Sequence, residues 1–203
     1  CIRDRFVQRL KKLLSYNLGK EGRQTTLRME LEIVKEYIAL QQMRYDFIIE
    51  MNIEDGSYLD QPTVRMLFQP LVENAIRYGL GDDEKISIQV FEDVARHFAV
   101  VTISDSGKGL NQEEIDEINQ PFDYDWGYWK NENRGIGLRY VKAMLESFYD
   151  GQTSLFVNSK KGFGTKITIL LPVREPEEKK EKDKEVTLEE NKVGQTDERI
   201  DCR

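Results

Sequence analysis

Residue types that cross-link chains or bind metals are scarce in this sequence. Its only cysteines, Cys1 and Cys202, stand at the two ends of the 203 residues, so no disulfide framework holds the fold, which fits a reducing, cytosolic setting. The only histidine, His97, has no cysteine, histidine or carboxylate partner spaced around it. This isolation predicts a structural role for His97 and excludes a zinc site and a catalytic triad.

Long apolar runs are also missing. No stretch approaches the roughly 20 apolar residues that a membrane-spanning helix needs, and no signal peptide is visible. The chain begins with Cys1 in mid-pattern rather than with Met, so we expect it to be a piece of a longer protein.

Acidic residues outnumber basic ones and give the chain a net charge of −7. This balance argues against general nucleic-acid binding, which needs a basic surface. A negative protein can still bind nucleotides, because phosphate sites are built locally from backbone amides and one or two cations. Hydrophobic residues make up 39% of the chain, which is enough for one sizeable core and a small appendage.

The two ends of the chain differ from its middle. Apolar residues recur at helical spacing from Ile2 to Leu18, which predicts a helix that either packs on a partner helix or folds onto the main domain. From Arg174 onward Glu, Lys and Asp dominate and aromatic residues vanish. We therefore expect residues 174–203 to form a disordered or frayed charged tail, a solvated extension rather than a regulatory segment.

Between the ends, helix and strand patterns alternate. Thr25 or Thr26 predicts the capped start of a long helix that runs to about Tyr45, with Glu30 close to the capping-box position. Pro62 predicts the start of a second helix. The remaining patterns predict a helix that opens at Arg134 and strands at Phe47–Ile53, Lys85–Phe91, Phe98–Ser104, Thr153–Asn158 and Thr165–Leu171.

The most informative stretch follows the strand Phe98–Ser104 and reads Asp105-Ser-Gly-Lys-Gly109. Gly107 and Gly109 allow the backbone to come close to something else. An aspartate at the mouth of a buried strand can accept hydrogen bonds from an exocyclic amine such as that of adenine. An isolated pattern of this kind is more often an ordinary polar turn, so the case for function rests on its neighbours.

The helix predicted from Pro62 carries Asn74 at the margin of a broad apolar face, with Arg77 and Tyr78 on the same side and Glu73 opposite. An amide oxygen is a hard ligand, a guanidinium pairs with phosphate, and a phenol donates a hydrogen bond. The set therefore suits a Mg²⁺–phosphate edge. A capping or satisfied core asparagine is an equally good interpretation of this helix alone.

A long polar segment, residues 111–134, follows the aspartate turn. Its first half, Asn111–Asn119, predicts a short helix, and the rest is typical of a mobile flap that closes over a ligand. Directly after it, Gly135-Ile-Gly-Leu138 opens a helix. Glycines at a helix N-terminus leave backbone amides free to face an anion, and the helix dipole adds to the attraction.

In this order, the motifs resemble those of the sensor histidine kinases. Residues 71–79 look like the N box of that family, residues 105–109 like its first glycine box, residues 135–138 like its second, and residues 162–165 like its final Gly-x-Gly-Thr. The resemblance spans about Thr26 to Val173, and residues 68–75 are similar to the LytS/YesM-type kinases in particular.

The resemblance implies an α+β fold, a two-layer α/β sandwich of the Bergerat ATP-binding type. Its mixed sheet is covered on one face by helices, and a mobile lid covers ATP, the implied cofactor together with Mg²⁺. The same resemblance divides the chain into the end of a dimerisation helix region (1–23), an ATP-binding catalytic domain (24–173) and the charged tail (174–203).

The resemblance also assigns the phosphate side of the ATP site. Asn74 coordinates Mg²⁺, Arg77 and Tyr78 approach the phosphates, and Asn74 and Arg77 serve catalysis. Tyr78 stands where many relatives have histidine. The phosphates are also held at the end of the flap by Gly135, Gly137 and the amide of Leu138.

At the base side, the resemblance assigns the adenine amine to Asp105. Gly107 and Gly109 admit the base, and Thr165 supports the adenine end.

The implied activity is transfer of the ATP γ-phosphoryl group to a histidine upstream of Cys1, because the phosphoacceptor motif is absent here and His97 is in the wrong place. The implied partners are the phosphoacceptor helix of the same protein or of its dimer mate, and a response regulator. Full-length homodimerisation and anchoring in the plasma membrane, with this domain cytoplasmic, are also expected.

Two other functions stay open. The first is a non-catalytic nucleotide-binding module that signals by a change of shape. The second is an ATP-gated clamp of the gyrase or MutL class, which carries a general-base glutamate four residues before the N-box asparagine. Pro70 stands at that position here, which counts against the clamp. An anti-sigma serine kinase shares the boxes but would not need the helix from Thr26 to Tyr45.

Overall fold

The computed structural model describes residues 2–19, 25–80, 85–119 and 136–174. The chain divides into two units, Cys1–Val173 and Arg174–Arg203. The predicted charged tail makes up the second unit and, apart from Arg174, lies outside the described residues.

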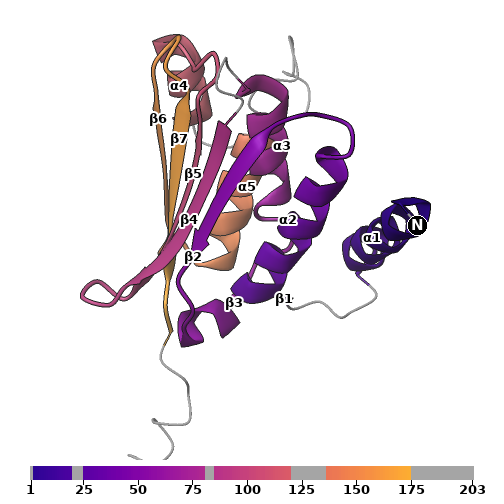
Figure 1. Ribbon diagram of the computed structural model, residues 1–203. Helices are drawn as coiled ribbons and strands as arrows, with labels where there is room; N and C mark the ends of the chain where they lie inside the picture. Colours follow the sequence, from indigo (N-terminus) through magenta and orange to yellow (C-terminus); the bar gives the residue numbers. More distant parts are fainter. Residues whose placement is uncertain (1, 20–24, 81–84, 120–135, 175–203) are drawn as a thin grey trace, which may run out of the picture. The chain divides into compact units, whose positions relative to one another are not determined.

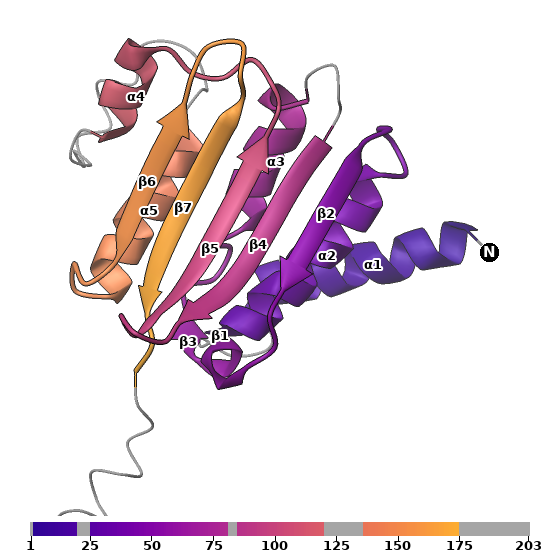
Figure 2. The ribbon, with the colours of Figure 1, turned by 60° about the vertical axis from the view of Figure 1, so that its left-hand side comes forward.

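The first unit is built on a five-stranded sheet with the strand order β2-β4-β5-β7-β6 (Figure 2). Its strands are β2 (Ile48–Ile53), β4 (Lys85–Asp93), β5 (Phe98–Asp105), β6 (Ser154–Ser159) and β7 (Thr165–Pro172). The β2–β4 pair is parallel and the other pairs are antiparallel, so the sheet is mixed. A separate two-stranded sheet pairs β1 (Thr25–Thr26) with β3 (Pro62–Thr63).

Helices cover one face of the large sheet (Figure 1). They are α2 (Leu27–Gln41), α3 (Gln69–Tyr78) and α5 (Ile136–Phe148), while α1 (Ile2–Asn17) packs on α2. A short α4 (Gln112–Asn119) and a 3₁₀ turn, η1 (Ser57–Asp60), complete the described elements. The predicted fold class, a mixed sheet covered on one face by helices, is confirmed.

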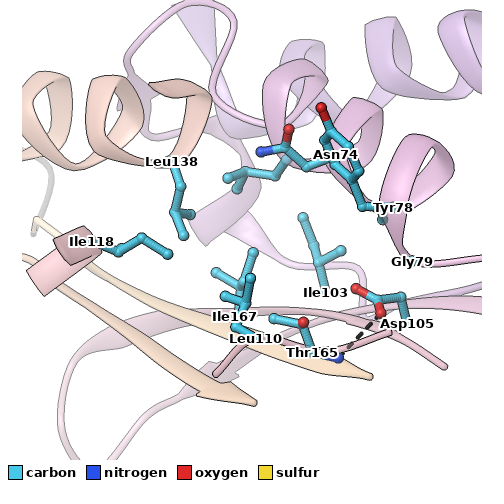
Figure 3. A pocket seen from close by; sticks show the side chains of 13 residues that line it. Asn74, Tyr78, Gly79, Ile103, Asp105, Leu110, Ile118, Leu138, Thr165 and Ile167 are labelled. Atoms are coloured by element: carbon cyan, nitrogen blue, oxygen red, sulfur yellow. Dashed lines mark hydrogen bonds between the residues drawn. The ribbon is translucent and has the colours of Figure 1, made fainter. Parts of the chain in front are cut away.

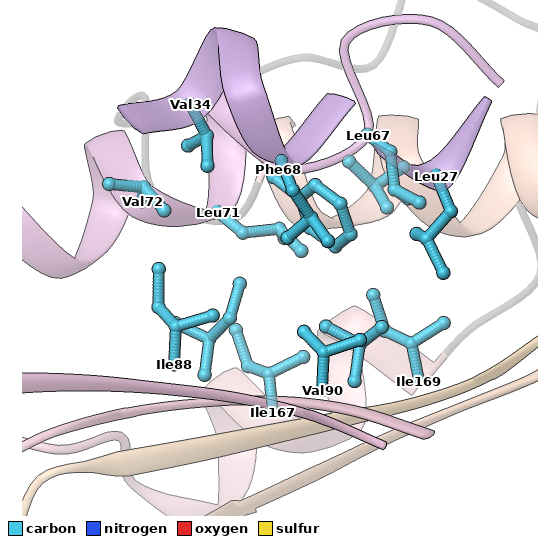
Figure 4. Packing of buried hydrophobic residues seen from close by; sticks show 14 of the residues in the cluster. Leu27, Val34, Leu67, Phe68, Leu71, Val72, Ile88, Val90, Ile167 and Ile169 are labelled. Atoms are coloured by element: carbon cyan, nitrogen blue, oxygen red, sulfur yellow. The ribbon is translucent and has the colours of Figure 1, made fainter. Parts of the chain in front are cut away.

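The core lies between this helical layer and the sheet (Figure 4). Along β4, Ile86, Ile88 and Val90 are buried, whereas the residues between them face away from the core. Phe68 and Leu71 project from the helical side and are fully buried. Burying each large apolar side chain contributes roughly 1.5–3 kcal/mol, so this contact fixes α3 against the sheet.

The capped start of α2 is confirmed, because Thr26 Oγ1 accepts the N–H of Met29 at 3.2 Å. The helix ends at Gln41, earlier than predicted, where Gln42 donates its side-chain amide to Phe47 O at 3.2 Å. Glu30 does not serve a capping box. Its carboxylate, 2% exposed, points into the protein.

The predicted helix from Pro62 was wrong in its start, because α3 begins at Gln69. Pro62 and Thr63 form β3, and Met66 adopts a left-handed φ of 58° that a helix cannot contain. The N–H groups of Met66 and Leu67 donate to the Glu30 carboxylate at 2.9 and 2.7 Å. Glu30, 36 residues before Met66 in the chain, therefore supplies the acceptor that a helix would otherwise provide. Local periodicity does not reveal such a distant contact.

One stripe of α1 packs on the main domain and another stays exposed. Leu13 and Tyr16 are buried with Ile33 of α2. The second stripe consists of Phe6, Val7, Leu10 and Leu14, with Leu14 51% exposed, and continues to Leu18 directly after the helix. Folding onto the main domain is thus confirmed for the first stripe, and packing on a partner helix stays a prediction for the second.

None of the helices in the described part of the chain combines the length and apolar character that crossing a bilayer requires.

Candidate functional site

A pocket opens between α3, the N-terminal part of α5 and the ends of β5 and β7 (Figure 3). It brings together Asn74, Tyr78, Asp105, Gly109, Leu138 and Thr165 from the predicted site. Its other lining residues are Leu71, Ala75, Gly79, Ile103, Leu110, Ile118 and Ile167. The pocket is therefore an apolar slot with a few polar groups at its rim, which is typical of small-molecule sites.

Asp105 is the charged group of this pocket. It ends β5, and its Oδ1 accepts the N–H groups of Gly107 and Thr165, each at 3.1 Å. Figure 3 shows the other carboxylate oxygen on the side of the pocket. Burial raises the pKa of Asp105, and the two backbone hydrogen bonds oppose that rise. The carboxylate is thus oriented by the backbone and presents an acceptor to a ligand.

The glycines of this region are required by backbone packing. A Cβ on Gly107 would lie 2.3 Å from the Cα of Gly79, and a Cβ on Gly109 would lie 2.1 Å from Lys160 O. Gly109 also has a φ of 64°, which favours glycine. In the described residues, protein backbone fills the space that these side chains would need, so admission of the base by Gly107 and Gly109 stays a prediction.

The α3 residues divide between two faces. Asn74 and Tyr78, one turn apart, line the pocket. Arg77 is not among the lining residues, and its guanidinium pairs with Glu73 at 3.0 Å on the exposed side. Residues three and four apart are both neighbours on a helix, and the Arg77 guanidinium also lies 5.9 Å from the centroid of the Tyr78 ring. The expected common side of Arg77 and Tyr78 therefore agrees with the structure, whereas the placement of Glu73 away from Arg77 was wrong. The approach of Arg77 to the phosphates stays a prediction.

The start of α5 adjoins Asn74. A Cβ on Gly137 would lie 3.4 Å from Asn74 Nδ2, and Leu138 is buried at the pocket wall. The first backbone amides and the positive end of the dipole of α5 are therefore close to the Asn74 amide. Gly135 and the flap beyond Asn119 lie outside the described residues, whereas the short helix expected at 111–119 is confirmed as α4.

Sequence reasoning missed Ser159, whose side chain forms hydrogen bonds to the loop after β5 and to the start of β7. Its Oγ accepts the N–H of Leu110 at 2.8 Å, donates to Gly164 O at 2.8 Å and lies 2.9 Å from Thr165 Oγ1. The available signal was the position of Ser159 directly after the predicted strand Thr153–Asn158, since Ser159 pairs with Thr165 at the start of the next predicted strand.

A metal ion has little to hold it here besides Asn74. In residues 2–19, 25–80, 85–119 and 136–174, no group of at least three His, Cys, Asp or Glu side chains is arranged around a metal. The amide oxygen of Asn74 fits Mg²⁺ only as one ligand among phosphate and water oxygens, which is how Mg²⁺ is commonly held beside nucleotides.

Comparison with known proteins gives a consistent result. The family model of histidine kinase-, DNA gyrase B-, and HSP90-like ATPases matches residues 59–175, and the histidine kinase model matches residues 3–48. The sensor protein kinases HptS of two Staphylococcus aureus strains are 30% identical over 168 residues, 82% of this chain. The chain spans 32% of the length of these relatives.

A solved structure shows the same fold. It is the histidine kinase domain from the Erythrobacter litoralis EL346 blue-light activated histidine kinase, at a TM-score of 0.53 and 19% identity. The match covers 84% of this chain and 74% of that one.

Proposed function

Because the chain belongs to the family of histidine kinase-, DNA gyrase B-, and HSP90-like ATPases and carries the ATP-binding catalytic domain of a sensor histidine kinase, we propose that its pocket delivers the γ-phosphoryl group of ATP to a histidine on an upstream helix. The observation that carries this proposal is the orientation of Asp105 at an apolar slot. A carboxylate fixed by two backbone N–H groups is an acceptor for the adenine amine, and Ile103 and Ile167 line the slot with apolar side chains.

The phosphates extend, in this proposal, toward Asn74 and the start of α5. Gly137 and Leu138 offer amides there, and Gly135, to which the resemblance gives the same role, lies outside the described residues. The Asn74 amide oxygen holds Mg²⁺, which neutralises phosphate charge when it is bound. The hydroxyl of Tyr78, on the same face of α3, donates a hydrogen bond to the phosphates. Arg77 reaches the phosphates only after leaving Glu73, so we assign it to the transfer step rather than to resting binding.

In the proposed transfer, the bond between the γ-phosphorus and the β,γ-bridging oxygen breaks, a bond from phosphorus to an imidazole nitrogen forms, and ADP leaves. Catalysis is then positioning and charge neutralisation. His97 does not serve as acceptor. It is exposed in the turn before Phe98, at the end of β5 opposite Asp105.

We further propose the LytS/YesM subtype, homodimerisation through the exposed stripe of α1, a response regulator as the final acceptor, and membrane anchoring of the full-length protein. The division at residues 23 and 173 belongs to the same proposal. Pro70 at the start of α3 leaves no glutamate four residues before Asn74 and disfavours a clamp ATPase.

The test is phosphoryl transfer from γ-labelled ATP to the chain extended by its upstream helix. We expect label on a histidine of that helix, stable to base and labile to acid, and none in an Asn74→Asp variant. Binding of ATP without any labelled histidine would instead identify a non-catalytic nucleotide-binding module.

A further inference from the structure

The last turn of α1 forms a hydrogen bond and a cation–π contact with the segment that leads into α3. Tyr16, 1% exposed, bonds through its hydroxyl to Glu30 and, at 2.7 Å, to Thr25 Oγ1. The Arg65 guanidinium lies 4.5 Å from the centroid of the Tyr16 ring and donates to Tyr16 O at 2.7 Å. Tyr16 is therefore held between α2 and residue 65, just before the turn into α3.

The carboxylate of Glu30 links Tyr16 to the turn before α3. Its Oε1 accepts from Tyr16 and from the N–H of Met66, and its Oε2 accepts from the N–H of Leu67. The left-handed Met66 lies outside the described helices and strands, so the Glu30 carboxylate, rather than a helix or sheet carbonyl, accepts its N–H. A buried carboxylate depends on all of its hydrogen-bond donors. Loss of the Tyr16 hydroxyl therefore weakens the hydrogen bonds from Met66 and Leu67 to the Glu30 carboxylate.

This turn sets the start of α3. The helix begins at Gln69, two residues after Leu67, and carries Asn74 and Tyr78 into the pocket. Because a helix is stiff over so short a length, a shift of its first turn also moves Asn74.

We propose that Tyr16 and Glu30 are positioning residues of the ATP site, through which the place of α1 is coupled to the placement of Asn74. The inference rests on the proposed function, in which the pocket binds ATP. Coupling of this kind is reciprocal, so ATP in the pocket tightens α1 against α2. The route joins the part matched by the histidine kinase model to the part matched by the ATPase model.

The test variant is Tyr16→Phe, which removes one hydroxyl and keeps the ring under Arg65. Its matched control is Tyr58→Phe. Tyr58 is also buried, and its hydroxyl donates to the carbonyl of Glu54, away from the start of α3. Both variants and the wild-type chain are titrated calorimetrically with Mg-ATP, and amide hydrogen exchange is followed without nucleotide.

We expect Tyr16→Phe to weaken ATP about two- to tenfold, as loss of one hydrogen bond predicts, and to speed exchange at Met66 and Leu67 by a similar factor. Exchange in β5 and β7 should stay unchanged, and Tyr58→Phe should leave the ATP affinity as it is. Glu30→Gln keeps the shape of the side chain but only one acceptor oxygen, so it should change ATP affinity and exchange in the same direction as Tyr16→Phe. It replaces Tyr16→Phe in the test if that variant does not fold.

Uniformly faster exchange in all elements with unchanged ATP affinity would overturn the coupling and leave a structural role. An equal loss of affinity in Tyr58→Phe would also overturn it. If the wild-type chain binds no ATP, the proposed function fails first. If it binds ATP and Tyr16→Phe binds it equally, only this inference fails.

Discussion

The Cα atom of Gly79 fills the space that a side chain on Gly107 would need, because a Cβ at position 107 would lie 2.3 Å from it. The end of α3 and the loop after β5 thus pack backbone against backbone. This contact sets the distance between the helix that carries Asn74 and the strand that carries Asp105. The width of the pocket therefore depends on two residues without side chains.

Gly107→Ala should force these two segments apart. Overpacking of this kind costs about 1–3 kcal/mol, so we expect that loss in the free energy of unfolding, measured with urea, together with weaker nucleotide binding. Gly137→Ala is the control, because its Cβ would meet Asn74 and Pro70 at 3.4 Å, an ordinary contact. Equal stability losses in the two variants would contradict the close-approach argument.

Glu30→Gln should change how stability depends on pH. Burial, the largest cause, raises the pKa of Glu30 in the folded chain above its usual value of 4.5. The folded state then binds a proton more readily than the unfolded state. The contribution of Glu30 to the free energy of unfolding is therefore fully present below about pH 4.5, and it is lost as the pH rises through the pKa of Glu30 in the folded state.

The free energy of unfolding of the wild-type chain minus that of Glu30→Gln should therefore fall as pH rises from 4.5. Asp105, whose pKa burial also raises, is present in both proteins, so we expect its contribution to cancel in this difference. Glu32→Gln, on the exposed side of α2, gives the baseline for loss of one carboxylate from the helix. A difference that stays flat with pH would show that burial does not perturb Glu30.

The individual strands and helices could be predicted from the sequence because strand alternation and helix stripes are local patterns. Their arrangement as a mixed sheet covered on one face by helices was expected from the resemblance to the histidine kinases. The start of α3 could not, because the Glu30 carboxylate replaces the acceptors that a helix would supply to Met66 and Leu67. The periodicity of Val64, Leu67 and Phe68 reflects burial and was interpreted as a helix. In general, long-range side-chain acceptors leave no periodic signal.

Phe68→Ala should strongly destabilise the fold. Phe68 is 0% exposed, directly before α3, and a truncated core phenylalanine typically costs about 3–5 kcal/mol. Phe156→Ala is the matched control, since Phe156 is 55% exposed and its loss should cost below about 1 kcal/mol. Denaturant unfolding of both variants measures the difference, and similar losses would mean that the core is misplaced.

Arg77→Ala should leave stability unchanged, because the guanidinium and its partner Glu73 are both exposed and such pairs contribute little. If Arg77 acts in phosphoryl transfer, the labelling rate should fall while the affinity for ATP changes little. Glu73→Ala, which frees Arg77, should not slow labelling. Weaker ATP binding with an unchanged labelling rate would place Arg77 in resting binding instead.

Much of the candidate site could also be predicted, since Asn74, Tyr78, Asp105, Leu138 and Thr165 do meet at one pocket. What failed was the separation of Glu73 from Arg77, because their four-residue spacing places them on one helix face, where they form an ion pair. Ser159 was missed because its role arises only when the β6–β7 hairpin closes and brings its hydroxyl to Thr165.

The most direct test of the account is calorimetric titration of Mg-ATP into the wild-type chain and into Asp105→Asn. The asparagine keeps an oxygen for Gly107 and Thr165 but can present its NH₂ group to the adenine amine. Asp93→Asn, at the far end of β4, controls for the loss of charge. We predict binding to the wild-type chain that Asp105→Asn weakens about 10- to 150-fold, the equivalent of a charged hydrogen bond. Weakening below about threefold would contradict the assignment of Asp105 to the base.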